Sequence, residues 1–430
     1  MVYNLSMEKS MNYDVVIVGG GTSGCACAYI CAKNNLKTLL IEKNNFLGGL
    51  MTGGLVVPIM KSSIDEINCD YYKDLIEKAK SYNAQITYSD GNDGWLNPEV
   101  LKIVLDDLLD LENLDILFET EVKSVVYEEN KISSIVLNSN LLSIPVVSKY
   151  YIDATGSAEF SKLCKCEFLN DDFEKQQNSL RFILGNVDVE KFCNFILEID
   201  KDRDITNTYR HDRDTNNKLN FTTASTWDTS KHWALDKYLL KSVEDGVLKD
   251  TDRAYFQVFS VAQGDNQVAF NCPRINNFNN EPIMYSRELK EARKAIWRLF
   301  EFVKRYFPGF ENAIINNIAT QTGIREQNRV KTKYIYTQDD LLSSKAFDNP
   351  VLRANYSIDI HSDKKDGSTL QKTNTYELPL EALMSADYDN LFVIGKILGA
   401  DFRAHSALRV QKSCMSMGEA VAKHVAKNIN

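Results

Sequence analysis

The 430-residue sequence lacks any run approaching the roughly 20 apolar residues that a membrane-spanning helix requires, so we expect a soluble protein that does not enter a membrane. Basic residues do not predominate either. The 50 lysines and arginines stand against 59 aspartates and glutamates, a net charge of -9, and no basic stripe with interleaved aromatic residues appears, so no nucleic-acid partner is expected. The N-terminal segment lacks the unbroken apolar stretch of a secretory signal, and we predict a short disordered tail over residues 1–12.

Cysteines with disulfide or metal-ligand spacing are missing as well. The nine cysteines are an odd number without framework spacing, which is typical of a reducing compartment, and we expect a cytoplasmic protein. Cys25, Cys27 and Cys31 do not converge on one face of a helix, so we predict small buried thiols rather than a metal or redox site. The stretch that begins at Asp200 opens like a calcium loop, but Ile205 stands where the turn glycine belongs, and we predict a solvated loop without metal.

Residues 14–43, "DVVIVGGGTSGCACAYICAKNNLKTLLIEK", have the order of a dinucleotide-binding βαβ unit. A short β-branched strand leads into Gly19, Gly21 and Gly24, which satisfy the pattern G-x-G-x-x-G. The first glycine allows a tight turn, the second lets a pyrophosphate approach the backbone, and the third lets the helix pack on the strand. The helix N-terminus then presents N–H groups to the phosphates. Glu42 ends the next strand, where a carboxylate bonds a ribose hydroxyl.

Patterns along the rest of the chain predict that this sheet is interrupted by an insertion and completed at the C-terminal end. A helix is expected from about Asp65 to Ala84, and Asn97 and Pro98 begin another as N-cap and first helical residue. Residues 114–138 alternate as paired strands, and "YYIDATGSAEF" is a further strand that enters a turn. Near the end, a strand, a turn at Gly395 and a helix of small residues return to the same sheet.

In order and nearly from end to end, the chain resembles the FAD-dependent oxidoreductases related to fumarate reductase and succinate dehydrogenase flavoprotein subunits. The resemblance runs through "DVVIVGGGTSG", "IEKNNFLGGLMTGGL", "YYIDATGSAEF", "TGIREQNRV", "YSIDIH" and "NLFVIGKILGADFRAHSALRVQKSC", of which "TGIREQNRV" and "YSIDIH" are more particular to this family. It implies a Rossmann-like, glutathione-reductase-like α/β FAD-binding domain over residues 1–169 and 376–430, with an inserted α+β substrate lobe over residues 170–375. It also implies non-covalent FAD, since no histidine precedes the "MTGG" loop.

The resemblance and the glycine pattern together imply a set of cofactor-binding residues. Glu42 would hold the adenosine ribose, Val122 would bind adenine through its backbone, and "GGLMTGG" would line the flavin. The last helix, starting near Val410, would aim its N–H groups at the flavin edge that becomes anionic on reduction. The full set is Gly19, Gly21, Thr22, Ser23, Gly24, Glu42, Lys43, Gly49, Met51, Thr52, Gly53, Val122, Ala154, Thr155, Gly156, Gly395, Leu408 and Val410.

Two arginines in "GIREQNR" are candidates for binding an anionic substrate. Arg325 and Arg329 are four residues apart and would share one face of a helix, from which both could clamp a carboxylate. The alternative is a structural salt-bridge network with Glu326. Asn271 and Arg274 in "FNCPRINN" are weaker candidates for lining the substrate lobe.

The candidate catalytic residues are Arg325, His361, Arg409 and His405. His361 in "YSIDIH" would have Asp359 on the same side of an extended segment, and the pair could orient an acid or a base. A structural histidine is the alternative. Family members often carry a histidine at the position of Phe402, and whether His405 takes its place stays open.

These features predict an FAD-dependent dehydrogenase or reductase that transfers a hydride between flavin N5 and a small polar substrate that bears a carboxylate. No second nucleotide pattern appears, so we expect a separate electron donor or acceptor rather than direct reduction by NAD(P)H. The alternatives are a flavin monooxygenase, a thiazole-synthase-like enzyme, or a non-catalytic protein that binds FAD or NAD. Lys396 occupies the position where hydroxylases of this fold usually place an aspartate, which disfavours the first alternative.

Overall fold

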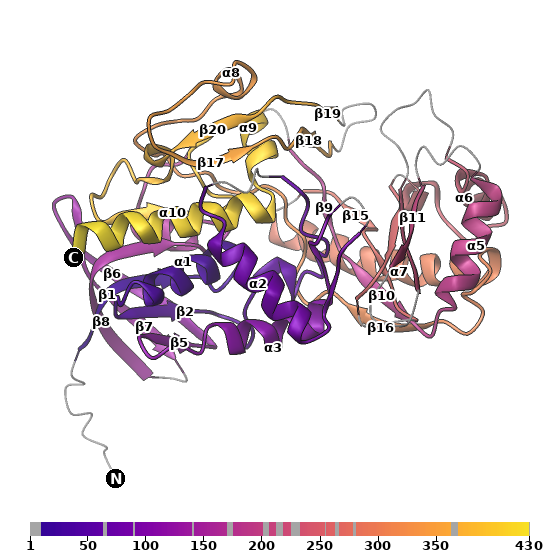
Figure 1. Ribbon diagram of the computed structural model, residues 1–430, viewed down its shortest axis with the longest axis horizontal. Coiled ribbons are helices and arrows are strands. Elements are labelled where there is room, and N and C mark those ends of the chain that lie inside the picture. Colours follow the sequence, from indigo (N-terminus) through magenta and orange to yellow (C-terminus); the bar gives the residue numbers. More distant parts are fainter. Residues whose placement is uncertain are drawn as a thin grey trace, which may run out of the picture.

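The chain forms two lobes, each built on its own β-sheet, together with several two-stranded ladders (Figure 1). The computed structural model describes residues 10–62, 67–88, 91–139, 142–169, 175–200, 206–211, 218–224, 233–253, 255–262, 266–277, 281–362 and 369–429. Among these residues, no helix combines the length and the apolar composition needed to cross a bilayer.

A seven-stranded sheet forms the first lobe, in the order β5-β2-β1-β8-β7-β6 with β21 beside β8. Strands β5, β2, β1, β8 and β21 run parallel, while β6 and β7 form an antiparallel extension. The strands are β1 (Met11–Val18), β2 (Thr38–Ile41), β5 (Leu114–Leu117), β6 (Thr120–Glu128), β7 (Lys131–Ser139), β8 (Leu142–Asp153) and β21 (Leu391–Val393). The return of the C-terminal strand to the first sheet is thereby confirmed.

The N-terminal end of this sheet differs from the prediction. Strand β1 begins at Met11, which pairs with Val146 of β8, so residues 11 and 12 belong to the sheet and not to a tail. The pairing with β8 supplies backbone hydrogen bonds that no pattern within the N-terminal segment reveals. Residues 1–9 lie outside the described residues.

Helices cover the sheet and bring the two ends of the chain together. α1 (Thr22–Lys33) packs against α10 (Gln411–Ile429), which lies across it in Figure 1. The crossing is close, because a Cβ added at Gly418 would lie 2.3 Å from the carbonyl oxygen of Ser23. Cys25, Cys27 and Cys31 are fully buried and free along α1, which confirms the prediction of small buried thiols.

Two further helices support the same lobe. α2 (Asp70–Ser81) is shorter at both ends than the predicted helix over residues 65–84. α3 (Pro98–Leu108) begins as predicted, with the side chain of Asn97 accepting hydrogen bonds from the N–H groups of Glu99 and Val100. The short helices α4 (Glu159–Leu163) and η1 (Gly49–Met51) follow the strands at the edge that faces the second lobe.

The second lobe is an antiparallel sheet in the order β11-β12-β13-β14-β10-β16, flanked by helices (Figure 1). Its core is rich in phenylalanine: Phe192, Phe256, Phe270 and Phe302 are fully buried and contact one another or shared neighbours edge to face. The elements are β10 (Phe182–Gly185), β11 (Thr206–His211), β12 (Lys218–Ala224), β13 (Gln257–Ser260), β14 (Val268–Phe270), β16 (Ile314–Ile318), α5 (Val189–Ile199), α6 (Asp236–Glu244), η2 (Asp250–Arg253) and α7 (Pro282–Tyr306).

Strand β11 corrects the solvated loop predicted after Asp200, because residues 206–211 pair with β12. Residues 201–205 and 212–217 lie outside the described residues. The predicted fold class, an α/β domain with a mainly parallel sheet and an inserted α+β lobe, is confirmed.

Short two-stranded ladders connect the lobes. β20 begins at Tyr376 and pairs with β17, so this ladder spans the predicted lobe boundary at residue 375. The remaining elements are β3 (Gln85–Ile86), β4 (Trp95–Leu96), β9 (Asn178–Ser179), β15 (Arg274–Ile275), α8 (Gln338–Leu342), β17 (Pro350–Ala354), β18 (Ile358–Ile360), β19 (Thr369–Gln371), β20 (Tyr376–Pro379), η3 (Leu380–Leu383) and α9 (Phe402–Leu408).

Candidate active site

A cavity of about 1320 Å³ runs from the carboxyl ends of β1, β2 and β8 to the second sheet. Its volume exceeds the roughly 300–1,000 Å³ of an ordinary ligand pocket, so it has room for a dinucleotide and a second molecule. One end is formed by the glycine-rich turns of the first lobe. The other end is formed by polar and charged side chains from the second lobe and the connecting ladders.

The glycine-rich turn after β1 has the geometry that a pyrophosphate requires. Gly19 has φ +107° and lies against the carbonyl of Ala154, and a Cβ at Gly24 would lie only 1.9 Å from the carbonyl oxygen of Gly19. At Gly21, in contrast, an added Cβ would meet nothing within 4 Å. Gly21 is also the N-cap of α1, and no side chain caps this helix end. The open space at Gly21 and the uncapped N–H groups therefore fit a bound diphosphate.

Glu42 lies at the end of β2, buried beside this turn. One carboxylate oxygen accepts a hydrogen bond from the N–H of Gly20 at 2.7 Å, and the other accepts from the backbone of Asn44 at 2.8 Å. The oxygen that accepts from the Asn44 backbone also accepts from the Asn44 side-chain amide, so these bonds fix the carboxylate at the cavity wall. The oxygen bonded to Gly20 keeps a further lone pair. The position fits the ribose contact predicted for Glu42.

The structure brings most of the predicted cofactor residues to the cavity, though not all. Met51, Thr52 and Leu408 are buried within the protein, where the Thr52 hydroxyl bonds the carbonyl oxygen of Leu47. Gly53 packs against the ring of Phe46. The members that line the cavity are Gly19, Gly21, Thr22, Ser23, Glu42, Lys43, Gly49, Val122, Ala154, Thr155, Gly156, Gly395 and Val410. Those that do not line it are Gly24, Met51, Thr52, Gly53 and Leu408.

Four arginines gather at the opposite end of the cavity, and we call them the arginine cluster: Arg181, Arg274, Arg325 and Arg409. Arg181, Arg325 and Arg409 line the cavity, whereas Arg274, a predicted substrate-lobe residue, does not line it. Arg181 and Arg325 are buried, and Arg274 lies with its guanidinium carbon 3.7 Å from the ring centroid of Tyr255. Burial lowers the pKa of Arg181 to about 10, and burial together with the other three guanidinium groups lowers the pKa of Arg325. Gathering these cations in one partly dry site costs free energy that an anion would offset.

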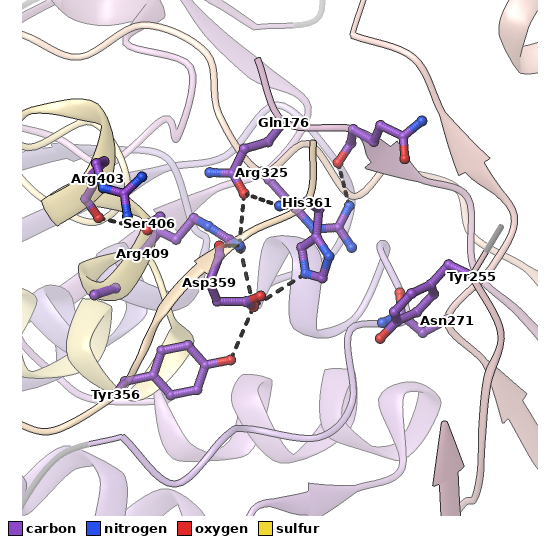
Figure 2. Close-up of polar contacts among 12 residues, drawn as sticks. Gln176, Tyr255, Asn271, Arg325, Tyr356, Asp359, His361, Arg403, Ser406 and Arg409 are labelled. Carbon is purple, nitrogen blue, oxygen red and sulfur yellow. Dashed lines mark hydrogen bonds and ion pairs between the residues drawn. The ribbon is translucent and has the colours of Figure 1, made fainter. Parts of the chain in front are cut away.

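Asp359 is the acidic side chain at this end of the cavity among the described lining residues. Figure 2 shows it between Tyr356, His361 and Arg409. Its Oδ2 lies 3.3 Å from the Tyr356 hydroxyl, 3.3 Å from His361 Nε2 and 3.7 Å from Arg409 Nη2. Burial opposes its ionisation, but the bond to His361 and the charges of Arg409 and Arg325 hold its pKa below the ordinary value. The carboxylate is therefore ionised and offsets one of the four positive charges.

His361 connects this carboxylate to the arginine cluster. Its Nδ1 lies 3.1 Å from Arg274 Nη2, and because a guanidinium only donates hydrogen bonds, Nδ1 is the acceptor. The ring proton is then on Nε2 and faces Asp359. Burial and the charges of Arg274 and Arg325 lower the pKa of His361 well below the usual value, so the ring is neutral. The predicted pairing with Asp359 on one side of an extended segment is confirmed.

The prediction that Arg325 and Arg329 share a helical face is wrong. Residues 323–329 form no helix, because their backbone is held by distant partners: Gly323 pairs with Ser179, and Val330 pairs with Ile397. Arg325 lines the cavity and donates to the carbonyl oxygen of Gln177 at 2.6 Å. Arg329 instead donates to the carbonyl oxygen of Ala400 and lies 3.6 Å from Glu326, which is the salt-bridge alternative.

Of the remaining predicted site residues, two line the cavity and one does not. Asn271 lines the cavity and donates to Gln257 at 2.9 Å. Arg409 also lines it and donates to Gln176 and to the carbonyl oxygen of Asp359. His405 does not: it is fully buried, and its Nε2 bonds the carbonyl oxygen of Lys396 at 2.8 Å. The structure therefore corrects the placement of His405 in the catalytic set.

The cavity also has lining residues that were not predicted to take part in the site, among them four at the end near the arginine cluster. Arg181, Tyr255, Gln257 and Tyr356 come from the second lobe and the connecting ladders. The lone charged residue in the apolar stretch "NSLRFILG" was a signal for Arg181, since a buried charge needs a partner. Tyr356 opens the segment "YSIDIH", in which only Asp359 and His361 were singled out, and no comparable signal marks Tyr255 or Gln257.

Comparison with known proteins gives a family match over nearly the whole chain. The family described as "FAD dependent oxidoreductase" matches residues 14–429. The chain is 28% identical over 185 residues to thiamine thiazole synthase of Methanococcus aeolicus, covering 40% of this chain and 64% of that protein. It is 29% identical over 76 residues to mitochondrial glycerol-3-phosphate dehydrogenase of Rattus norvegicus, covering 16% of this chain and 10% of that protein. The match thus spans less than two thirds of either relative.

Solved structures resemble the chain over almost its full length at low identity. A p-nitrophenol 4-monooxygenase from Pseudomonas putida superposes with a TM-score of 0.48 at 11% identity, covering 97% of this chain and 80% of that one. A geranylgeranyl bacteriochlorophyll reductase-like protein from Thermoplasma acidophilum gives a TM-score of 0.46 at 14% identity, with 98% and 79% covered.

Proposed function

The chain belongs to the family of FAD dependent oxidoreductases and is an enzyme with FAD as its cofactor, and from this premise we propose that it oxidises or reduces a small substrate bearing a carboxylate. FAD supplies a hydride donor or acceptor at N5 when it is bound. The glycine-rich end of the cavity would hold FAD, and the arginine cluster would hold the substrate at the other end.

The main support for this proposal is the excess of positive charge in the arginine cluster. At this end of the cavity, the described residues include four guanidinium groups, three of which line the cavity, against one lining carboxylate, Asp359. Burial lowers the pKa of Arg181, Arg274 and Arg325. An uncompensated buried charge is costly, whereas charge-assisted hydrogen bonds to a planar anion are strong and directional. A substrate carboxylate would satisfy these donors.

The surrounding residues have distinct roles in this proposal. Arg325 and Arg409 line the cavity and would bind the carboxylate directly. His361 would act as a positioning residue, because both of its ring nitrogens are occupied and it holds Arg274 against Tyr255. Asn271 and Gln257 add a neutral polar wall that could orient a hydroxyl or amino group.

A redox assay with paired compounds tests the proposal. The FAD-loaded protein would be mixed without oxygen with 2-hydroxy acids, 2-amino acids and saturated dicarboxylates, while the chemically reduced protein would receive unsaturated dicarboxylates including fumarate. Each acid would be matched by its amide. We expect flavin absorbance at about 450 nm to change with one class of acids and not with the corresponding amides. Equal responses to acid and amide would overturn the carboxylate assignment.

The same assay separates the finer alternatives. Reoxidation by fumarate would support the relationship to fumarate reductase that "TGIREQNRV" and "YSIDIH" suggest. If no member of the panel changes the flavin, a thiazole-synthase-like activity becomes the leading candidate, because the curated relatives reported above include such synthases. The cavity-lining Cys414 does not favour thiolate chemistry, since burial raises its pKa to about 12.

Three further properties belong to the proposal. FAD would be non-covalent and would leave with the small-molecule fraction on denaturation, as expected from the lack of a histidine before Met51. A separate electron donor or acceptor would complete the cycle, because the sequence has no second nucleotide pattern. A cytoplasmic location agrees with nine buried free cysteines.

A further inference from the structure

Lys396 lies between the two turns that form the phosphate end of the cavity. It follows Gly395 after β21 and lines the cavity. A Cβ at Gly395 would lie 2.8 Å from the Ser23 hydroxyl, so this turn packs on the first turn of α1. A Cβ at Gly156 would lie 3.1 Å from Lys396 Cε, so the lysine side chain also lies against the turn after β8. These are the two turns that a bound dinucleotide would follow.

The ammonium group of Lys396 has no counter-ion among the described residues. Its Nζ donates one hydrogen bond, to the carbonyl oxygen of Ile324 at 2.7 Å, although an ammonium group has three donors. No carboxylate of the described residues forms an ion pair with it, and Glu159, a carboxylate that acts on its pKa, is paired with Lys43 at 2.9 Å. The cation therefore has spare donors in a site that lacks compensating negative charge.

The electrostatic surroundings of Lys396 also favour the entry of an anion beside it. Burial lowers its pKa to about 8. The Cys414 thiol and Glu159 act to raise it, and Arg409 and Lys43 act to lower it, so burial decides the direction. A cation held in this way gains stability from any anion that enters the cavity beside it.

We propose that Lys396 binds the pyrophosphate of FAD, completing with a side-chain charge the anion site that the glycine-rich turn and the N-terminus of α1 provide with backbone groups. A competing role would be contact with the flavin ring, whose negative charge appears on reduction. The proposal rests on FAD as the cofactor and does not depend on the identity of the substrate, so it can fail while the proposed reaction holds.

The first test measures FAD affinity by quenching of flavin fluorescence in the cofactor-free protein at pH 7. Loss of one charge-assisted hydrogen bond predicts that Lys396→Met raises the Kd for FAD by roughly 10- to 100-fold. Lys396→Arg should stay within a few-fold of wild type, because it keeps the charge. Lys412→Met is the matched control: Lys412 is buried on α10 against the ring of Tyr72, does not line the cavity, and should leave the Kd unchanged. A Kd for Lys396→Met within two-fold of wild type would overturn the proposal.

The reduction potential distinguishes the pyrophosphate from the flavin ring. The pyrophosphate has the same charge in oxidised and reduced FAD, so Lys396→Met should weaken both forms equally and leave the potential of the bound flavin unchanged. A lower potential with an unchanged Kd for oxidised FAD would assign Lys396 to the ring and overturn the pyrophosphate contact. Neither measurement requires turnover.

The pH dependence of FAD binding tests wild type without any variant. In the cofactor-free protein the pKa of Lys396 is about 8, and pairing with an anion raises it. Affinity should therefore be fully present below pH 8 and should fall by about tenfold per pH unit above it, until the pKa of the complex is reached. Lys396→Arg and Lys396→Met should show no such fall. A wild-type Kd that stays constant from pH 7 to 9.5 would contradict the proposal even if every variant failed to fold.

Discussion

Arg325 and Arg329 are four residues apart in sequence, yet their guanidinium groups enter different environments. Arg325 donates to the carbonyl oxygen of Gln177 at the cavity wall, while Arg329 donates to that of Ala400 and lies beside Glu326, away from the cavity. The backbone between them forms no helix, so the two side chains do not share a face. One arginine is thus available to a substrate, and the other connects segments of the protein.

This divergence predicts opposite effects for the same substitution at the two positions. Arg325→Met should lower kcat/KM by roughly 10- to 150-fold, because a hydrogen bond to a charged group contributes about 1.5–3 kcal/mol. The free energy of unfolding should change little. Arg329→Met should leave the KM near the wild-type value and lower the free energy of unfolding by about 3–5 kcal/mol, because it removes the cation beside the buried Glu326 carboxylate. Steady-state kinetics and urea unfolding check the pair. A higher KM for Arg329→Met would restore it to the substrate-binding set.

His361→Gln tests whether the imidazole positions Arg274 or transfers a proton. Because burial and the charges of Arg274 and Arg325 lower the pKa of His361 well below its usual value, the ring is neutral at neutral pH. We expect kcat/KM to fall about tenfold through the loss of two hydrogen bonds, while the shape of the pH profile is retained. Loss of an ionisation from the profile of the variant would show instead that His361 is the acid or base.

The first lobe was largely predictable because its signals are local. The strand, the glycine turn and Glu42 follow one another within thirty residues, and Asn97 and Pro98 mark the start of α3 within two. The extension of β1 to Met11 was missed because its hydrogen-bonding partner, Val146, is distant in sequence. Local patterns thus locate these elements better than they locate their ends.

The substrate end of the cavity was harder to predict because it is assembled from distant segments. A spacing of four residues suggested a helix for Arg325 and Arg329, but backbone hydrogen bonds of Gly323 with Ser179 and of Val330 with Ile397 hold the segment in a non-helical course. Tyr255 reaches the cavity through the packing of the second sheet, which no local pattern reports. His361 and Asp359 were found together because a strand places alternate residues on one side.

The glycines of the phosphate turn should separate cofactor binding from folding. At Gly21 the backbone is extended, with φ -77°, and a Cβ would point into open space, so Gly21→Ala should fold with wild-type stability but should bind FAD at least tenfold more weakly. At Gly24 the Cβ would lie 1.9 Å from the Gly19 carbonyl oxygen, and Gly24→Ala should lose about 1–3 kcal/mol of stability without cofactor present. Thermal unfolding of the cofactor-free proteins and FAD titration give the two readouts. Equal FAD affinity for wild type and Gly21→Ala would place the phosphates elsewhere.

Asp359 predicts a specific dependence of stability on pH. Its pKa is lowered in the folded protein, so the unfolded chain binds more protons, and the stability it contributes is present above the unfolded pKa of about 3.9. That contribution is lost as the pH falls from about 4 toward the folded pKa, by at most about 1.4 kcal/mol per pH unit. Asp359→Asn has no such ionisation, so its free energy of unfolding should start lower at pH 7 and decline less steeply between pH 5 and 3, as measured by urea unfolding of the cofactor-free protein. Other carboxylates contribute equally to both proteins and cancel in the difference. Parallel curves would mean that the arginine cluster does not hold Asp359 ionised. Asp359 would then offset none of the positive charge of the arginine cluster.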